Sequence, residues 1–337
     1  MQYPRGSHFN PATHKSTEHR SASNNSAQKM RFKLKSAVHW FDTGYKSSER
    51  NNDADRVDLA RCMSLVILHL GCLGVIWVGF SWFALSIAAA LYFIRMFAIT
   101  AFLHRYFSHR SFKASRFMQF IFAVMASTTL QRGALWWASH HRKHHQQSDS
   151  KDDVHSPNTQ GFVWSHIGWL TSSKNFETDY NAVKDFAKFP ELVFLNRYNK
   201  LVPALMALGL YFLGAWAAAR WSILETSGTQ VLIWGFFIST TVLFHGTSTI
   251  NSLAHIFGNQ RFKTGDQSRN NFWLTLITLG EGWHNNHHHY MYSARQGFYW
   301  WEIDPTYYGL KVMSWLGMIH DLKPVPPRVL QEGQKTN

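Results

Sequence analysis

The stretch that decides the fold is Gly280-Glu-Gly-Trp-His284-Asn-Asn-His287-His288-His289-Tyr290, which contains the pattern His-x-x-His-His. Residues three and four apart share one face of a helix. Three imidazoles on one face are good ligands for a first-row transition metal. The same pattern occurs at His141-Arg-Lys-His144-His145, and a looser one at His104-Arg-Tyr-Phe-Ser-His109. We therefore expect a metal centre built from histidines.

The composition indicates a membrane protein with a sizeable polar part. The chain has 337 residues, of which 45% are hydrophobic and 16% aromatic, including 15 Trp. The mean hydropathy is nevertheless slightly negative, so membrane segments make up only part of the chain. A net charge of +14 is compatible with nucleic acid, anionic lipid or an acidic protein as a partner. The basic residues flank apolar segments, which favours the membrane and argues against nucleic acid.

The cysteines limit the possible metal chemistry. The chain has two, Cys62 and Cys72, in or beside an apolar run. They provide no disulfide framework, no iron–sulfur ligand set and no zinc finger. We expect a reducing environment that faces the cytoplasm.

The order of polar and apolar segments predicts one large membrane domain. Residues 1–29 are rich in Ser, Asn, His and Gln and are expected to form a disordered tail. Residues 30–60 are expected to be a basic cytosolic segment, and residues 61–322 the membrane domain. Residues 323–337 are expected to be a C-terminal tail.

Four apolar runs are long enough to cross a bilayer, and short connections group them into two helical hairpins. They cover about residues 63–80, 82–103, 201–221 and 231–250. Arg95 lies inside the second span, where we expect it to be satisfied by polar groups of the helix bundle. Residues 117–137 are also apolar, but a crossing there would separate His109 from His141. We therefore expect them to form a helix along the membrane interface.

The distribution of charge predicts the orientation. The linker 222–230 has no Lys or Arg, whereas basic residues gather before residue 61, between 104 and 200, and after 258. The positive-inside rule then places both termini and all histidine clusters in the cytoplasm. The expected fold is an all-α integral membrane protein, with four transmembrane helices in two hairpins and a cytosolic helical cap that holds the histidine clusters.

The spacing of the first cluster favours two metal ions. His104 and His109 are five residues apart, about 140° around an ideal α-helix, so they do not share one face. Either the helix ends between them or they serve different metals. All-imidazole coordination with open positions suits iron better than structural zinc, although dizinc hydrolysis and metal storage remain open. His255 is a further candidate ligand, and Asn251, one turn earlier, a candidate to hold a metal-bound water.

From about residue 60 to 322 the chain resembles the membrane acyl-CoA Δ9 (stearoyl-CoA-type) fatty acid desaturases. One histidine cluster alone would be shared with hydroxylases and ketolases, but the combination is specific. The matching stretches are His104-Arg-Tyr-Phe-Ser-His109-Arg-Ser-Phe, His141-Arg-Lys-His144-His145, Gly161-Phe-Val-Trp-Ser-His166-Ile-Gly-Trp169, Asn251-Ser-Leu-Ala-His255 and Gly280-Glu-Gly-Trp-His284-Asn-Asn-His287-His288.

The resemblance implies a mushroom-like fold whose cytosolic cap carries two iron ions. It implies oxygen-dependent insertion of a cis double bond at Δ9 of a saturated acyl-CoA, and Asn251 holding a water near one iron. It also implies nine metal ligands, namely His104, His109, His141, His144, His145, His255, His284, His287 and His288.

Two features bear on the substrate. Family members often carry Arg-Asp just before the second box, where this chain has Ser139-His140, so acyl-carrier-protein and lipid substrates also stay open. The resemblance places the end of the acyl tunnel near Ala88 and Tyr92. The bulky Tyr92 is then expected to favour shorter acyl chains, unless it is a packing residue of the bundle.

The chain has neither a His-Pro-Gly-Gly haem motif nor a cysteine set for an iron–sulfur module. We therefore expect an external electron donor, such as ferredoxin or cytochrome b5, to dock on the basic cytoplasmic face. We expect a bacterial inner membrane in preference to the endoplasmic reticulum.

Two other functions are compatible with the pattern. A histidine-box alkane or acyl hydroxylase would use the same irons but insert oxygen; the stretch from Asn251 to His255 favours the desaturase. A membrane metal-binding or transport protein would need ligands near the middle of its spans. Here the histidine clusters lie at or beyond the ends of the spans.

Overall fold

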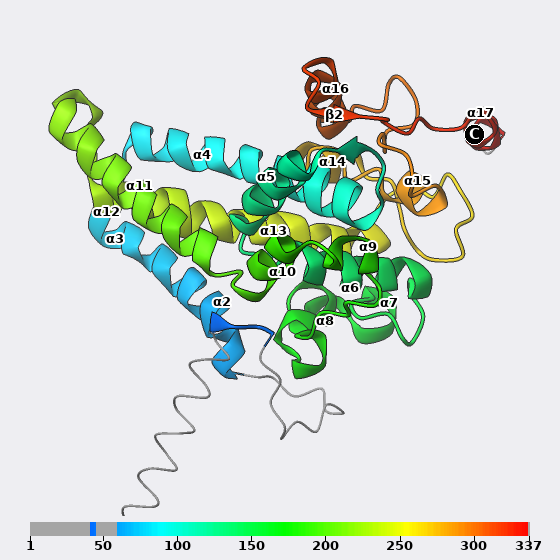
Figure 1. Cartoon of the computed structure of the whole chain (residues 1–337), viewed down its shortest axis with the longest axis horizontal. Helices are drawn as coiled ribbons and strands as arrows, with labels where there is room; N and C mark the ends of the chain where they lie inside the picture. The colour runs from blue at the N-terminus through cyan, green and yellow to red at the C-terminus, as the bar shows by residue number, and fades with distance from the viewer. Residues whose placement is uncertain (1–40, 45–58, 336–337) are drawn as a thin grey trace, which may run out of the picture.

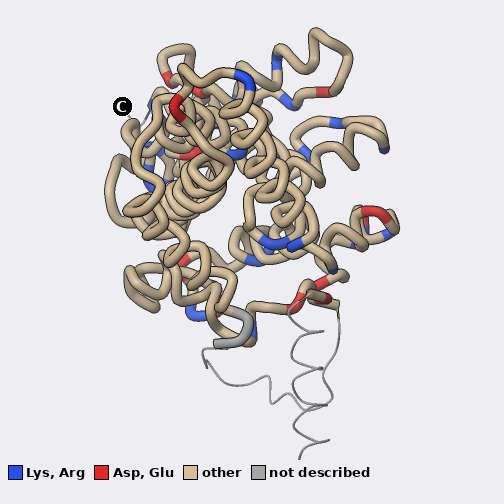
Figure 2. The backbone as a smooth tube through the Cα atoms, turned by 90° about the vertical axis from the view of Figure 1, so that its left-hand side faces the viewer, with Lys and Arg blue, Asp and Glu red and all other residues tan. Residues whose placement is uncertain are grey.

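The computed structural model describes residues 41–44 and 59–335. The expected tail 1–29 and nearly all of the basic segment 30–60 lie outside these residues. Figure 1 shows long helices running side by side toward the left and shorter elements gathered on the right. Figure 2 shows Lys and Arg at several separate positions around the fold.

The described part is mostly helical. Its first half contains α2 (Leu59–Gly71), η1 (Cys72–Gly74), α3 (Val75–Val78), α4 (Trp82–Phe97), η2 (Ala98–Ser108), β1 (Lys113–Ala114), α5 (Arg116–Ser127), α6 (Ala134–Gln147), α7 (Pro157–Gln160), α8 (Phe162–His166), η3 (Gly168–Thr171) and η4 (Ser173–Asn175). Its second half contains α9 (Lys184–Ala187), α10 (Pro190–Arg197), α11 (Leu201–Arg220), η5 (Ser222–Leu224), α12 (Gly228–Leu232), η6 (Ile233–Ile238), α13 (Ser239–Ser252), η7 (Leu253–His255), α14 (Phe272–Ile277), α15 (His284–His289), α16 (Pro305–Trp315), β2 (Ile319–His320) and α17 (Pro327–Gln334).

Three continuous helices in the described residues are long and apolar enough to cross a membrane. They are Trp82–Ser108, Leu201–Arg220 and Gly228–His255. The first expected span forms a shorter apolar helix, Cys62–Val78, which is followed by Gly79 at a φ of 67°. A left-handed φ ends a helix readily at glycine. Three predicted spans are thus confirmed as candidate membrane helices, whereas the four-span arrangement stays a prediction.

The buried Arg95 is satisfied inside the helix bundle. Its guanidinium donates to Thr240 Oγ1 and to Ser239 Oγ, both at 2.6 Å. These contacts join α4 to α13. The interpretation of Arg95 as a structural cation of the bundle is confirmed.

The apolar segment 117–137 is not one helix. Helix α5 ends at Ser127, and α6 begins at Ala134. Between them Leu130 and Arg132 adopt φ values of 57° and 63°, a left-handed conformation that a helix does not continue through. The prediction of a single helix here is wrong, although α5 is short and apolar, as expected for a segment that does not span.

The end of the described chain packs against earlier elements. Strand β2 pairs antiparallel with β1, and Lys113 lies opposite His320. This two-residue ladder is the only sheet among the described residues, and it departs from the expected all-α fold. Helix α17 lies within the expected tail 323–337, and its Val329 is buried in a cluster with Phe262 and Tyr299. The domain boundary at residue 322 stays a prediction.

Candidate metal centre

The helix that carries the first histidine cluster changes its winding before it reaches His104. Residues Ala98–Ser108 form a π-helix, in which each backbone N–H bonds to the carbonyl five residues earlier. The His109 amide donates to the His104 carbonyl at 3.2 Å. Residues five apart therefore lie above one another, and the two rings are 5.0 Å apart. The expectation that His104 and His109 do not share one face assumed α-helical winding and is wrong. The helix does not end between them, and both lie in the same histidine group.

One group of five histidines surrounds a common point. It consists of His104, His109, His141, His145 and His287, whose ligand nitrogens lie within 4.8 Å of one another. The Nε2 atoms form a chain of close contacts: His104 to His287 at 2.9 Å, His287 to His145 at 3.0 Å, His145 to His141 at 3.0 Å and His141 to His109 at 2.9 Å. Nitrogens at such separations are close enough to bind a common metal ion.

A second group contains four histidines: His144, His255, His284 and His288. The Nε2 atoms of His255 and His284 are 3.0 Å apart. His288 Nε2 is buried and has no hydrogen-bond partner among the described residues, while its Nδ1 contacts Asp266. Because a buried polar nitrogen without a partner is costly, this atom fits a group that requires a bound metal. All nine predicted histidines lie in one of the two groups.

The helices α6 and α15 divide their histidines between the groups in opposite senses. In α6, His141 and His145 join the five-histidine group and His144 joins the four-histidine group. In α15, His284 and His288 join the four-histidine group and His287 joins the other. On an α-helix the residue at i+4 is displaced by about 40° from residue i, and the residue at i+3 by about 60° in the other direction. The three imidazoles of a box therefore serve two sites, which corrects the expectation of one shared face.

Four carboxylates contact the Nδ1 atoms of imidazoles in the two groups. No prediction from the sequence included them. His255 Nδ1 contacts Asp149 at 2.9 Å, His144 Nδ1 contacts Asp153 at 3.0 Å, and His288 Nδ1 contacts Asp266 at 2.6 Å. In the other group, His104 Nδ1 contacts Glu281. A carboxylate at Nδ1 holds the proton there, so that Nε2 presents its lone pair to a metal. Three of these acids, Asp149, Asp153 and Glu281, lie within a few residues of a histidine box. This proximity could have identified them from the sequence, whereas Asp266 is distant from every box.

The electrostatics favour neutral imidazoles. Burial, followed by the neighbouring histidines, lowers the pKa of His109, His141 and His287 well below its ordinary value. Burial also lowers the pKa of His288 to about 4, although Asp266 opposes the shift. Neutral imidazole is the form that binds metal. Burial would raise the pKa of Asp266, but its hydrogen bond with His288 holds that pKa below the ordinary range.

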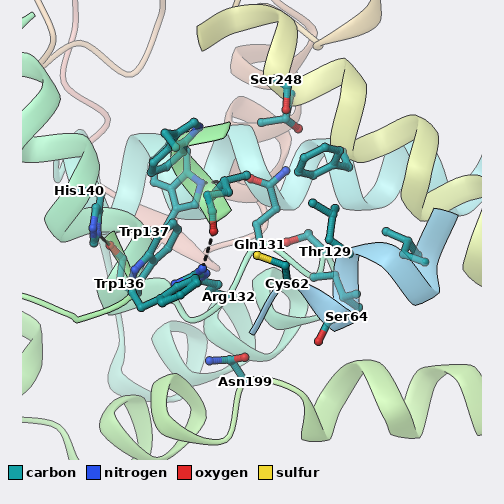
Figure 3. Close-up of a pocket in the computed structure, with 18 of the residues that line it drawn as sticks. Cys62, Ser64, Thr129, Gln131, Arg132, Trp136, Trp137, His140, Asn199 and Ser248 are labelled. Atoms are coloured by element: carbon teal, nitrogen blue, oxygen red, sulfur yellow. Dashed lines mark hydrogen bonds between the residues drawn. The ribbon is translucent and has the colours of Figure 1, made fainter. Parts of the chain in front are cut away.

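A cavity of about 170 Å³ leads toward the histidines. Figure 3 shows side chains such as Cys62, Gln131, Trp137 and Ser248 around it. A smaller cavity of about 40 Å³ lies against both groups and is lined by Ile99, His104, Trp137, His141, His144, Thr247, Ile250, Asn251, Glu281 and His284. Four residues, Trp137, His141, Thr247 and Asn251, line both cavities, so the larger one approaches the metal centre.

The remaining predicted site residues fall in different places. Asn251 lines both cavities, and its carbonyl accepts a hydrogen bond from Ser165. Ala88 and Tyr92 line neither cavity; the Tyr92 hydroxyl donates to the Ile277 carbonyl at 2.6 Å. His140, at one of the two positions that depart from the family pattern, lines the larger cavity and donates through Nδ1 to the Trp136 carbonyl.

Known proteins share much of this sequence. The profile of the family described as fatty acid desaturase matches residues 80–312. The acyl-CoA 5-desaturase of Anemone leveillei is 38% identical over 266 residues, 78% of this chain and 78% of that protein. The sn-1 stearoyl-lipid 9-desaturase of Synechocystis sp. is 38% identical over 250 residues, 74% of each chain. The chloroplastic palmitoyl-monogalactosyldiacylglycerol delta-7 desaturase of Arabidopsis thaliana is 33% identical over 295 residues, 86% of this chain and 73% of that protein.

Proposed function

Because the chain belongs to the fatty acid desaturase family, we propose that it inserts a cis double bond at Δ9 of a saturated acyl chain, using two iron ions. The observation that carries the proposal is the pair of histidine groups beside a cavity that reaches them. Family membership makes the chain an acyl desaturase, hence an oxidoreductase of lipid metabolism. The position of the double bond, the number of metals and their identity belong to the proposal.

The nine histidines would hold the ions through the nitrogens that converge in each group. Bound iron would supply the reduction of oxygen and the oxidising power that removes two hydrogens from adjacent methylenes. The contribution of the chain is to position the substrate. Trp137 and Thr247 line both cavities, so they would hold the reacting carbon–carbon bond against the metal centre. Asn251 would hold a water beside the four-histidine group.

We propose acyl-CoA as the carrier of the acyl chain. The larger cavity is lined by Arg132 and Lys200, and by no carboxylate among the described residues. Such a lining favours an anionic head group, since cations attract phosphate. The relatives include an acyl-CoA desaturase and acyl-lipid desaturases. An anionic lipid or an acyl-carrier-protein thioester is therefore the alternative carrier.

The membrane topology and the electron donor complete the proposal. The chain would cross a bacterial inner membrane four times, with both termini and the metal centre in the cytoplasm. Electrons would come from an external donor such as ferredoxin or cytochrome b5. The basic balance of the chain, +14, would attract an acidic donor.

The test is the fatty-acid profile of a host that lacks desaturase activity, measured by gas chromatography with mass-spectrometric location of the double bond. The host expresses the wild type, His288→Ala or His289→Ala together with a donor. His289 is the matched control, because it lies outside both groups and pairs with Glu332. We expect a Δ9 monounsaturated acid from the wild type and His289→Ala, and none from His288→Ala.

Other products would redirect the assignment. Hydroxylated acids would identify the histidine-box hydroxylase instead, and a different bond position would correct Δ9. Purified enzyme given stearoyl-CoA or a phospholipid with the same acyl chain, with donor and oxygen, then distinguishes the carriers. Conversion of the phospholipid alone would overturn the acyl-CoA assignment.

A further inference from the structure

The carboxylates are distributed unequally between the two histidine groups. In the four-histidine group three imidazoles have a carboxylate at Nδ1, from Asp149, Asp153 and Asp266. In the five-histidine group one imidazole, His104, has such a partner among the described residues. The group with fewer imidazoles therefore has more negative charge around it.

The charges on the four-histidine side are not cancelled by cations. Apart from its imidazole, Asp149 accepts from Ser156, Asn158 and the Gln267 amide. The other hydrogen-bond donors to Asp153 are backbone amides, and those to Asp266 are Thr264 and Ser268. No Lys or Arg pairs with these three carboxylates in the described part of the chain.

The five-histidine side is close to electrically neutral by comparison. Glu281 is shared with Arg105, whose guanidinium also forms two hydrogen bonds with Asp304, at 3.0 and 3.1 Å. Arg142 donates to the Ser108 carbonyl next to His109, which places another cation near this group. Arg142 is itself paired with Asp185, which also pairs with Arg110. The three carboxylates on this side, Glu281, Asp304 and Asp185, are thus matched by three guanidinium groups.

We propose that Asp149, Asp153 and Asp266 make the four-histidine group the tighter of the two metal sites, so that the five-histidine group releases its ion first. The inference rests on the proposed function, because it requires two bound ions. A carboxylate partner fixes the ring, sets the tautomer and raises the basicity of the ligand, and its loss typically costs about 10- to 100-fold in metal affinity. The extra imidazole of the other group works in the opposite direction, but it is neutral and adds no charge.

The experiment uses the full-length protein in detergent, loaded anaerobically with Fe²⁺ to two ions per chain. Excess 2,2′-bipyridine then removes the iron, and the coloured complex reports the rate. We expect two phases of one ion each, the slower by at least about 10-fold. Asp266→Asn should accelerate the slow phase by about 10- to 100-fold and leave the fast phase unchanged.

Three further variants assign the phases. Asp149→Asn acts on a different ligand, His255, and should accelerate the same slow phase. Glu281→Gln should accelerate the fast phase only. Asp321→Asn is the control: its carboxylate is exposed, pairs with Lys113, and should leave both phases unchanged.

A measurement on the wild type does not depend on the folding of any variant. Protein loaded with ⁵⁷Fe and chelated to one ion per chain should show one Mössbauer doublet of the two seen before chelation. Loss of both doublets in parallel, or a single phase for both ions, would overturn the inference while leaving the diiron proposal intact. Failure of the wild type to take up two ions would instead contradict the proposed function.

Discussion

Two candidate membrane helices end at the histidine groups, and they reach these groups by opposite changes of winding. Trp82–Ser108 widens into the π-helix η2, and that winding brings two histidines, His104 and His109, to one point. Gly228–His255 tightens into the 3₁₀-helix η7, which delivers His255 alone. Helices α6 and α15 together supply three histidines to each group. The two histidines from η2 therefore make a group of five, and the one from η7 makes a group of four. Helix winding, rather than the number of histidines in the chain, sets the size of each group.

The largest expected effect comes from removing the ligand that each winding delivers. We expect His109→Ala and His255→Ala each to lower product formation by more than about 100-fold, because a lost ligand costs more than a lost partner of a ligand. Each variant should retain about one iron per chain, measured by mass spectrometry of the purified protein. His320→Ala, on the exposed edge of β2, is the control. Retention of two irons by His109→Ala would contradict this account, since η2 would then not deliver a needed ligand.

The second prediction concerns the close packing of the N-terminal ends of α6 and α15 against neighbouring backbone. A Cβ at Gly282, just before α15, would lie 2.3 Å from the Asn271 carbonyl oxygen and the Thr275 amide nitrogen. A Cβ at Gly133, just before α6, would lie 2.5 Å from Asn196 Cα. Both neighbours are backbone and cannot move away cheaply. We expect either Gly→Ala change to lower the free energy of unfolding by about 1–3 kcal/mol or more.

Thermal unfolding and iron content of the purified variants test this expectation. Gly209→Ala in α11 is the matched control, because its Cβ would meet nothing within 4 Å. This change should leave the free energy of unfolding unchanged or raise it slightly, since Ala has a higher helix propensity than Gly. If Gly282→Ala melts like Gly209→Ala, the close seating of α15 is not needed for the centre.

A third prediction separates substrate chemistry from metal binding. Asn251 lines both cavities and belongs to neither histidine group. We expect Asn251→Ala to lower turnover by about 10- to 100-fold while two irons per chain remain. Turnover and iron content are measured on the same preparation. Loss of an iron together with turnover would make Asn251 a residue of metal binding instead.

The smallest expected effect is on the length of the product. We predict that Tyr92→Ala shifts the product toward longer acyl chains, and that total product falls less than in the variants above. Tyr92→Phe is the control: it removes only the hydrogen bond to the Ile277 carbonyl, worth about 1 kcal/mol. The distribution of product chain lengths by gas chromatography is the measurement. An unchanged distribution would assign Tyr92 to packing between α4 and α14.

Sequence reasoning was most reliable where the local pattern carried the chemistry. All nine predicted histidines lie in the two groups, because spacings of three and four keep the imidazoles of α6 and α15 on neighbouring faces of an α-helix. Three candidate spans followed from the length of apolar runs. The reasoning was wrong at His104 and His109, where winding departs from the α-helix, and between Ser127 and Ala134, where left-handed residues interrupt an apolar segment.

The amino-acid sequence alone determined the family, the apolar helices and the histidines that could hold metal, because these depend on residue type and local spacing. Only the tertiary structure decided how the histidines divide between two groups and which carboxylates support them. Asp266 reaches His288 from 22 positions away, and Asp149 reaches His255 from 106. Contacts across such separations depend on how whole elements pack, and packing is a property of the folded chain rather than of any stretch of it.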